Sequence, residues 1–472
     1  MAKTLKAKQL PSDRMSTTDE YGARVYLHPE DVVGKFRDLR TKVYWFLIAV
    51  YLILPWIHFH GKQSVLMDIV KREFTFFGNT FYGHDAPIIF FVLIGSTFFF
   101  AFMTSLLGRV WCGWACPQTV FIDAIFRRIE RMVEGKSRAR RDLARAPWSF
   151  EKLFKRSLKW ALYTLVSLHI VHSFLGYFVG THELVKMSIH APTENWGTFL
   201  AMLICTGIIL FDFGWFKEQF CIIACPYGRF QSVIMDPHSP VVAYDVKRGE
   251  PRRSPKIARP AEGDCIDCAH CIKVCPTGID IRRGTQMECI ACTMCIDACD
   301  EIMLKLQRPK GLIRYATEES LAGGKTKWIR PRVIMYLVIL LVIASGFIYT
   351  LKNRGNISAV MLRGNKSGYQ VVKTVNGVII VNHYKIHFNN SSDQEYQLYF
   401  QLNPPELDSK IKLITPTVPF GLKKGFKFAN VFFRFKKNVL TNGSRKIKLD
   451  ILQNKNGKKI IISKEVNLVG PF

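Results

Sequence analysis

The sequence is poor in acidic residues: 37 Asp and Glu stand against 66 Lys and Arg among 472 residues, and the formal net charge at pH 7 is +29. A strongly basic chain can indicate nucleic-acid binding, but no recognisable nucleic-acid-binding module is present, so we exclude nucleic acid as a partner. Cysteine is absent after Cys299, which excludes a disulfide or a thiolate metal site from the C-terminal region. A signal peptide is also lacking, because a polar segment of 42 residues precedes the first apolar run and no cleavage site follows it.

Hydrophobic residues make up 49% of the chain, which excludes disorder, and they are concentrated in long runs. A helix that crosses a bilayer needs about 17–25 mostly apolar residues. A buried helix of a soluble protein is rarely this long without a charge. The sequence therefore predicts five membrane spans, at Val43–Phe59, Ile88–Leu107, Trp160–Val179, Thr198–Phe216 and Val333–Thr350.

Lys and Arg are distributed unequally between the segments that join these spans. Three segments contain 40 of them and the other two contain 4, namely residues 1–42, 108–156 and 217–332 against residues 58–87 and 180–197. Positively charged loops stay on the cytoplasmic side, where they contact anionic lipid. We therefore expect a cytoplasmic N-terminus and, after five spans, a C-terminal domain on the opposite face.

The last 117 residues, 356–472, contain short alternating segments instead of long apolar runs. Turn signals separate these segments, at Asn376-Gly377, Asn442-Gly443 and Asn456-Gly457, and Asn-Gly between strands is a strong hairpin signal. The pattern predicts an all-β domain, an antiparallel sandwich of immunoglobulin-like type. The strands are expected at 377–388, 395–402, 410–414, 427–435 and 446–453.

Eight cysteines of the segment 217–332 form two runs with the same spacing, Cys265-x2-Cys268-x2-Cys271-x3-Cys275-Pro276 and Cys289-x2-Cys292-x2-Cys295-x3-Cys299. This is the pattern of bacterial ferredoxins with two [4Fe–4S] clusters, in which the fourth cysteine of each run completes the other cluster. Zinc sites need two pairs instead of two quartets, and cytoplasmic disulfides are rare. The expected ligand sets are therefore Cys265, Cys268, Cys271 and Cys299 for one cluster, and Cys275, Cys289, Cys292 and Cys295 for the other.

The second run departs from the pattern at one position, because Asp300 follows Cys299 where the first run has a proline. We expect an altered local geometry at Cys299 but the same ligand. Two adjacent clusters indicate one-electron relay.

Four further cysteines form two matching pairs in Trp111–Gln118 (WCGWACPQ) and Phe220–Gly228 (FCIIACPYG), each with a Cys-x3-Cys-Pro motif shortly after a span. A spacing of four is expected to put both thiols of a pair on one helical face, and the proline disfavours helical backbone at the second cysteine. Soft thiolates favour Cu(I), and Arg109 with the basic loop is expected to lower the thiol pKa. A copper or redox-dithiol site is thus indicated at Cys112, Cys116, Cys221 and Cys225, the alternative being packing at helix contacts.

Three ionisable residues lie inside the spans, and such residues are functional by default. His169 and His172 are three residues apart on the third span, where they are candidates for haem or copper ligands or for hydrogen bonds between helices. Asp212 lies in the fourth span and has no assigned role. Cys205 lies in the middle of the same span and is assigned to packing.

With these motifs placed, the chain resembles the CcoG family, also called FixG or RdxA, the accessory proteins of cbb3-type cytochrome c oxidase. The resemblance lies in Arg24–Arg40 (RVYLHPEDVVGKFRDLR), Leu54-Pro55-Trp56, Gly108–Phe121 (GRVWCGWACPQTVF), the second C-x3-C-P motif, the ferredoxin quartets and the outer β domain. It implies a multi-span α-helical protein of the bacterial inner membrane with a cytoplasmic ferredoxin domain and a periplasmic immunoglobulin-like domain. It also implies a cupric reductase that takes electrons from a cytoplasmic donor and supplies Cu(I) to the oxidase or its copper-assembly factors.

The expected organisation has five parts: a cytoplasmic N-terminal segment (1–42), a four-span domain (43–216), a cytoplasmic loop (217–332) with an extended linker at 248–260 and the ferredoxin domain at about 258–305, a fifth transmembrane helix (333–350) and the β domain (356–472). Two other functions remain open at this point. One is an electron-transfer subunit of a quinol dehydrogenase, and the other is a non-catalytic scaffold for oxidase assembly. The sequence also leaves the oligomeric state open, a homo-oligomer included.

Overall fold

The computed structural model describes residues 17–471 except for 19–20, 22–23, 60, 71–72, 83–85, 254–262, 353–356, 365–367, 375–376, 391–393, 424, 442 and 454–459. The chain divides into two compact units, with the boundary between Ile348 and Tyr349, and each unit is described by itself. Two sets of residues from the sequence predictions lie outside the described residues. They are the second part of the expected linker, residues 254–260, and the turn residues Asn376, Asn442, Asn456 and Gly457.

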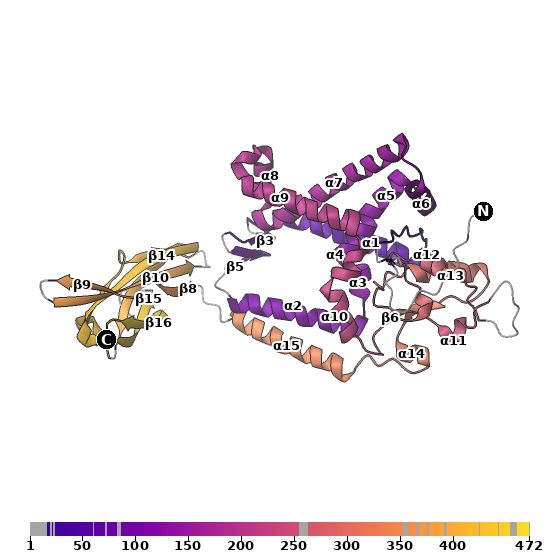
Figure 1. The fold of residues 1–472 in the computed structure, drawn as a ribbon. Helices are drawn as coiled ribbons and strands as arrows, with labels where there is room; N and C mark the ends of the chain where they lie inside the picture. The colour runs from indigo at the N-terminus through magenta and orange to yellow at the C-terminus, as the bar shows by residue number, and fades with distance from the viewer. Residues whose placement is uncertain are drawn as a thin grey trace. The chain divides into compact units, whose positions relative to one another are not determined.

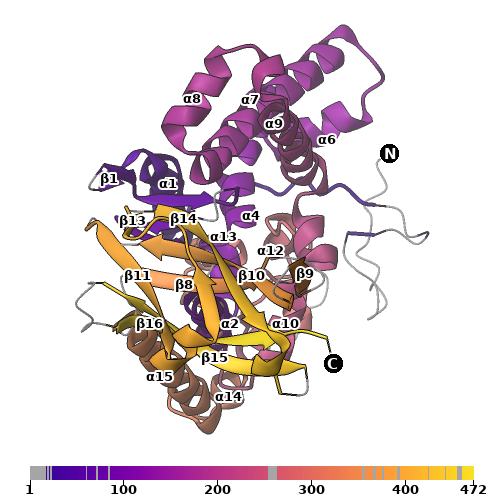
Figure 2. The same ribbon diagram turned by 90° about the vertical axis from the view of Figure 1, so that its left-hand side faces the viewer.

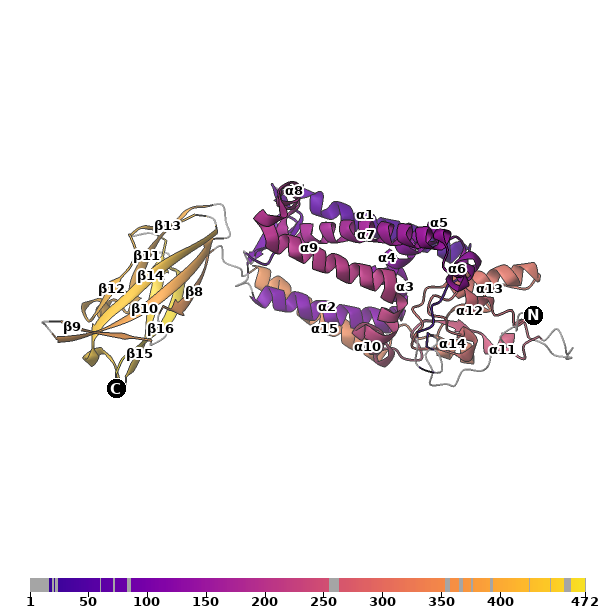
Figure 3. The same cartoon turned by 45° about the horizontal axis from the view of Figure 1, so that its top comes forward.

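Five helices of the described chain are long and apolar enough to cross a membrane, as the sequence predicts. They are α1 (Lys35–Ile53), α2 (Ala86–Leu107), α7 (Phe150–Val179), α9 (Trp196–Ile209), which the π-helical segment η4 (Leu210–Phe216) continues, and α15 (Pro331–Lys352). Figures 1 and 3 show these helices running in a similar direction. The helices α2 and α15 pack together, because Gly346 leaves room for the ring of Phe91.

The first span differs from the prediction at both ends. Helix α1 begins at Lys35, eight residues earlier than expected, and the span ends at Trp56 in a single 3₁₀ turn, η1 (Leu54–Trp56). Pro55 supplies no backbone N–H to continue the helix. The next residues form the strand β1 (His58–Phe59), which pairs with β2 (Lys62–Gln63).

A small sheet that the sequence did not reveal follows the first span. It is three-stranded and antiparallel, with β3 (Val65–Asp68), β4 (Glu73–Phe76) and β5 (Asn79–Tyr82). Gln63 fixes this region to the end of α7, because its amide donates to the carbonyl oxygen of Gly176 (2.9 Å) and accepts from the backbone of Thr181 (3.0 Å).

Short helices join the spans. Between α2 and α7 they are α3 (Val110–Trp114), α4 (Pro117–Phe121), the π-helical η2 (Ile122–Phe126), α5 (Arg127–Glu134) and α6 (Ser137–Arg145). The other connections contain α8 (Thr181–Ile189), η3 (Pro192–Asn195), the π-helical η5 (Phe220–Ala224) and α10 (Pro226–Ile234).

The ferredoxin module lies at one end of the membrane helices, where Figures 1 and 3 show α12 to α14 gathered. Its elements are β6 (Val241–Tyr244), α11 (Val246–Gly249), α12 (His270–Lys273), η6 (Ile281–Arg283), α13 (Met294–Lys305), β7 (Ile313–Ala316) and α14 (Glu318–Ala322). The strands β6 and β7 pair antiparallel and close the module, which makes one core with six of the eight quartet cysteines. The module and the membrane helices belong to the same compact unit.

The second unit consists of two antiparallel sheets around one apolar core. One sheet contains β8 (Ile357–Arg363), β9 (Gln370–Thr374), β10 (Gly377–Asn390), β12 (Ile411–Ile414) and β14 (Gly425–Lys436), and the other contains β11 (Tyr396–Asn403), β13 (Phe420–Leu422), β15 (Ser444–Leu452) and β16 (Ile460–Val469). The 3₁₀ turns η7 (Pro405–Ser409) and η8 (Lys437–Val439) lie between strands. Figure 2 shows the strands of this unit face on. The five expected strands are present, and β8, β9, β13 and β16 are additional.

Candidate iron–sulfur centre and membrane thiols

The two cysteine runs of the ferredoxin module fold in the same way. In each run, the second and fourth residues after the first cysteine have a left-handed backbone: Asp267 and Ala269 in one, Ala291 and Thr293 in the other. None of the four is glycine, so this conformation is strained, and strain of this kind accumulates at functional sites. The matching geometry curls each Cys-x2-Cys-x2-Cys loop around its own cavity.

Each cavity is lined by the fourth cysteine of the other run. Cys299 of the second run lines the cavity of Cys265, Cys268 and Cys271. Cys275 of the first run lines the cavity of Cys289, Cys292 and Cys295. Below, "distal quartet" means the set with Cys299, and "proximal quartet" means the set with Cys275, which lies nearer to the membrane thiols.

The expected change in geometry after Cys299 is present. Cys275 comes after the end of the short helix α12 and precedes Pro276. Cys299 instead lies inside α13, which continues to Lys305. Asp300 uses its carboxylate to accept a hydrogen bond from the backbone of Gly311 (2.9 Å). The helix therefore replaces the proline turn, and Cys299 still faces its cavity.

The donor set fits iron–sulfur clusters better than zinc. Within the described part of the chain, no three His, Cys, Asp or Glu side chains gather tightly enough to hold a single metal ion. A zinc site would need four ligands about 2.0–2.3 Å from one ion. Four thiols spread around an apolar cavity instead match a larger cubane, and the two quartets provide this arrangement twice.

The membrane cysteine pairs do not share a helical face, and that expectation is wrong for both motifs. Cys112 lies in α3, but Cys116 has an extended backbone (φ −62°, ψ 125°) and precedes α4. Likewise, Cys221 lies in η5, whereas Cys225 is extended (φ −71°, ψ 112°) and precedes α10. The physical reason is the proline that begins each following helix, which excludes helical backbone at the residue before it.

The first of these motifs packs directly on the proximal quartet. Gly113 approaches the loop so closely that a Cβ there would lie 2.7 Å from the carbonyl carbon of Ala291, between Cys289 and Cys292. The Trp114 indole donates to the hydroxyl of Tyr315 (3.0 Å), which donates to the Ala291 carbonyl oxygen (3.3 Å). These contacts hold the membrane motif against the ferredoxin loop.

The first thiols of the two pairs lie on one apolar patch. Cys112 and Cys221 both pack against the cluster of Val32, Val274, Ile290, Cys292, Met294 and Ala298, and so does Cys295. Gln231, which the sequence did not single out, contacts the Cys112 sulfur at 3.3 Å with its amide nitrogen. The structure therefore gathers thiols from both halves of the membrane domain beside the proximal quartet.

The expected lowering of the thiol pKa is wrong. Burial raises the pKa of Cys112 to about 12, and the opposing effect of Arg109 is smaller. Burial also raises the pKa of Cys116 and of Cys221. Arg109 has a limited effect because its guanidinium is directed to the carbonyl oxygens of Met287 and Cys289.

Two family profiles match the chain. The profile described as "4Fe-4S dicluster domain" matches residues 216–318, which contain both quartets, and the profile described as "4Fe-4S binding domain" matches residues 88–138, which contain the first membrane motif.

Curated relatives decide the family. The chain is 36% identical to protein RdxA of Cereibacter sphaeroides over 68% of its own length and 70% of RdxA. It is 38% identical to protein RdxB of the same organism over 65% of each chain, and 35% identical to nitrogen fixation protein FixG of Rhizobium meliloti over 64% of its own length and 59% of FixG. The chain belongs to the FixG/RdxA family.

As a member of the FixG/RdxA family, the chain is a membrane iron–sulfur protein of electron transfer. Among solved structures, a FixG-related protein from Vibrio parahaemolyticus matches 25% of this chain and 100% of its own length, at 13% identity and a TM-score of 0.20. A score of this size does not define a common fold.

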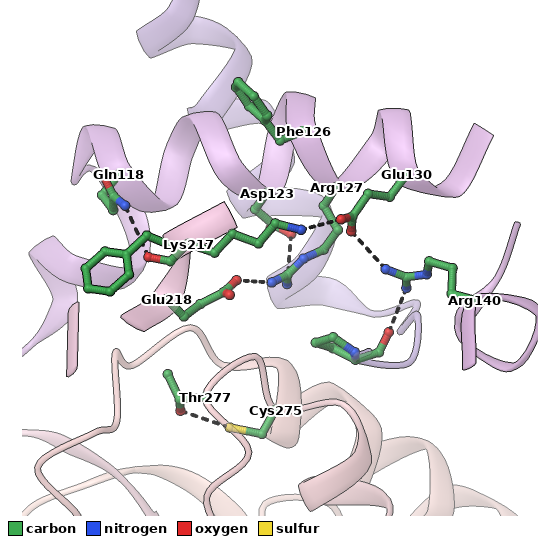
Figure 4. A network of polar contacts seen from close by, with 12 residues as sticks. Gln118, Asp123, Phe126, Arg127, Glu130, Arg140, Lys217, Glu218, Cys275 and Thr277 are labelled. Carbon is green, nitrogen blue, oxygen red and sulfur yellow. Dashed lines mark hydrogen bonds and ion pairs between the residues drawn. The ribbon is translucent and has the colours of Figure 1, made fainter. Parts of the chain in front are cut away.

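In this FixG/RdxA-family chain, buried charges hold the connections around the membrane motifs in place. Figure 4 shows Lys217 and Arg140 on the carboxylate of Glu130, and Arg127 on the carboxylate of Glu218. Gln118 donates to Asp212 (3.0 Å), which gives that intramembrane carboxylate a partner. Asp212 is therefore part of the support for the first motif.

The two intramembrane histidines lie away from the thiols. His169 and His172 line a cavity of about 460 Å³ between α7, α8 and α9, together with His190, Met187 and Met202. Two residues three apart on one helix reach the same side of a ligand, so they cannot supply the two opposite axial ligands of a single haem. Cys205 packs near Val171, Leu175 and Leu184, in agreement with the packing role expected for it.

Proposed function

We propose that this protein is a membrane electron-transfer chain that reduces Cu(II) to Cu(I) at the thiols Cys112, Cys116, Cys221 and Cys225. One observation carries the proposal: the Cys-x3-Cys-Pro motif containing Gly113 is packed against the loop of the proximal quartet. A redox-active thiol site needs an electron source close by, and this contact brings the source and the thiols together.

The two quartets are assigned as cluster ligands, with Cys265, Cys268, Cys271 and Cys299 for the distal cluster and Cys275, Cys289, Cys292 and Cys295 for the proximal one. When bound, the clusters supply one-electron transfer, and each Cu(II) takes one electron. Cys268 is the exposed cysteine of the distal quartet, which supports entry of electrons there from a soluble donor.

Copper is assigned from the chemistry of the ligands. Thiolates are soft donors and stabilise Cu(I) over harder ions. With the family resemblance, this favours supply of Cu(I) to a cbb3-type oxidase or its assembly factors. Direct ligation by His169 and His172 is a less favoured arrangement, because their cavity lies elsewhere.

The proposed placement has the N-terminus and ferredoxin module in the cytoplasm and the β domain in the periplasm, from the 40-to-4 distribution of Lys and Arg. Two antiparallel sheets around one core support an immunoglobulin-like sandwich for the second unit. We propose the domain boundaries at 42, 216, 332 and 350 together with this arrangement. The first boundary lies inside α1, because this helix starts at Lys35.

The thiol site is tested by serine variants of each pair, Cys112→Ser with Cys116→Ser and Cys221→Ser with Cys225→Ser. Serine keeps the size but removes the soft sulfur, so Cu(I) binding and Cu(II) reduction should fall at least tenfold while the cluster spectra remain. Cys205→Ser is the matched control, since this thiol is also in the membrane domain but only packs. Full copper binding and turnover with all four replaced would place the site elsewhere.

The cluster ligands are tested by iron and sulfide content, expected at about eight of each per chain, and by Cys275→Ser. Because Cys275 lines the cavity of the second run, this variant should alter the spectrum of the proximal cluster and leave the distal one. Loss of only the distal cluster would contradict the crossed assignment.

A further inference from the structure

Two arginines of the membrane domain bind the backbone of the proximal quartet. Arg40, from α1, donates to the carbonyl oxygen of Cys292. Arg109, which precedes α3, donates to the carbonyl oxygens of Cys289 (3.1 Å) and Met287. The two residues are 69 apart in the sequence, yet both guanidinium groups reach the same cysteine loop.

These positive charges are buried and incompletely neutralised. Arg40 is 1% exposed and Arg109 is 8% exposed. Asp123 is the carboxylate partner of Arg40 (3.0 Å), but it also pairs with Arg37 and Arg127. Among the residues that the structure describes, Arg109 has no carboxylate within ion-pair distance. Buried positive charge therefore contacts the backbone of the proximal quartet.

The distal quartet lacks this excess of positive charge. Arg282 lines its cavity, but it pairs with Asp280 (2.7 Å) and with Asp267. Asp267 also pairs with Arg252 (3.6 Å), so carboxylates balance the guanidinium groups beside this cavity. The two cavities have the same thiol arrangement, but among the described residues only the proximal quartet is contacted by a buried guanidinium, that of Arg109, without a carboxylate partner.

Charge and solvent exposure act in opposite directions on a cluster. Reduction adds one negative charge, which burial disfavours and a nearby positive charge favours. No cysteine of the proximal quartet is exposed, whereas Cys268 of the distal quartet is. Burial alone would therefore make the proximal cluster harder to reduce and would oppose electron flow towards the membrane thiols.

We propose that Arg40 and Arg109 are tuning residues that raise the reduction potential of the proximal cluster and so direct electrons from the distal quartet towards the membrane thiols. This inference rests on the proposed relay. Arg40 also connects the proximal cysteine loop to the first membrane motif. Its guanidinium donates to the hydroxyl of Tyr44 (2.9 Å), which in turn donates to the carbonyl oxygen of Gly113. The same side chain thus contacts the cluster loop and the thiol motif.

The test is a redox titration of both clusters, followed by electron paramagnetic resonance, in the purified full-length protein and in Arg109→Gln. We expect the proximal cluster to become about tenfold harder to reduce, which is about 59 mV for a one-electron couple, while the distal midpoint stays unchanged. Arg109→Lys and Arg40→Lys keep the charge and should retain most of the wild-type midpoint. Arg282→Gln is the matched control and should lower only the distal midpoint.

Iron content decides whether a variant is interpretable. If Arg109→Gln loses iron, Arg40→Gln replaces it, because this variant removes the other buried positive charge that contacts the cysteine loop, at the carbonyl oxygen of Cys292. An unchanged proximal midpoint, or equal shifts of both clusters, would overturn the inference. These results are independent of copper: midpoints that shift as expected in a protein whose thiol variants still reduce Cu(II) would contradict the proposed function and leave the tuning role intact.

Discussion

Gly113 is the residue at which the membrane motif and the ferredoxin loop come closest. A Cβ there would lie 2.7 Å from the carbonyl carbon of Ala291. This neighbour is a backbone atom, so it can move aside only if the loop itself shifts. We expect Gly113→Ala to destabilise the contact by about 1–3 kcal/mol, as overpacking does. The measurement is the thermal midpoint in detergent, followed by cluster absorbance. Gly207→Ala is the control, because nothing lies within 4 Å of its Cβ position, and equal midpoints for the two variants would contradict the close approach.

Glu130 gives the charge network a predictable response to pH. Burial alone would raise the pKa of this carboxyl, but Lys217, Arg140 and Lys159 lower it to about 2, from an ordinary value of 4.5. A carboxyl with a lowered pKa stabilises the folded state above about pH 4.5, and this contribution is lost as the pH falls towards 2.

We therefore expect Glu130→Gln to destabilise the protein by about 3–5 kcal/mol at neutral pH, because it leaves buried cations unpaired. The variant should also lose part of the fall in thermal midpoint between pH 5 and pH 3. Glu151→Gln is the control, since Glu151 forms an exposed pair with Lys155 and such pairs contribute little. A neutral-pH midpoint equal to that of the control would show that the network is not stabilising.

At the scale of elements, a ferredoxin side chain completes the first membrane helix. The carboxylate of Asp297, in α13, accepts hydrogen bonds from the backbone N–H groups of Phe36 (3.2 Å) and Arg37 (2.7 Å) at the start of α1. Gly34, the residue directly before α1, leaves room for this carboxylate, because a Cβ at Gly34 would lie 2.6 Å from the Cβ of Asp297. The cap of α1 is thus supplied by a residue more than 250 positions away.

We expect Asp297→Ala to lower stability by about 0.5–2 kcal/mol, the usual loss when a helix cap is removed. The loss should appear in the thermal midpoint and as faster release of iron, because the cap joins α1 to the helix that contains Cys295 and Cys299. Glu301→Gln, on the exposed side of the same helix, is the control. Indistinguishable rates of iron release in the two variants would show that the cap does not hold the module to the membrane domain.

At the scale of the whole molecule, the proposed orientation predicts where reporter enzymes work. Alkaline phosphatase fused after Phe472 should be active, because the enzyme folds only outside the cytoplasm, and a fusion truncated after Arg145 should be at least tenfold less active. A fluorescent protein in the same two positions should give the opposite result. Activity of the phosphatase only at Arg145 would invert the topology.

The sequence by itself determined the features that depend on neighbours along the chain. Five apolar runs define five spans because crossing a bilayer depends on the length and hydropathy of one segment. The spacing of Cys265–Cys275 and Cys289–Cys299 defines two cluster loops, because a short loop can wrap a cubane in few ways. Alternating residues located five strands of the C-terminal unit in the same manner.

The tertiary structure alone decided the features that depend on distant residues. The sequence predicted that proline disfavours helical backbone at Cys116 and Cys225. Only the structure showed where each helix ends, and therefore that the two thiols of a pair do not share a helical face. Arg40 and Cys292 are 252 positions apart, and no local pattern shows that a buried cation of a membrane helix meets a cysteine loop. Such long-range contacts decide which quartet lies beside the membrane thiols. The ligand spacing is the same in both cysteine runs, so it cannot distinguish the two quartets.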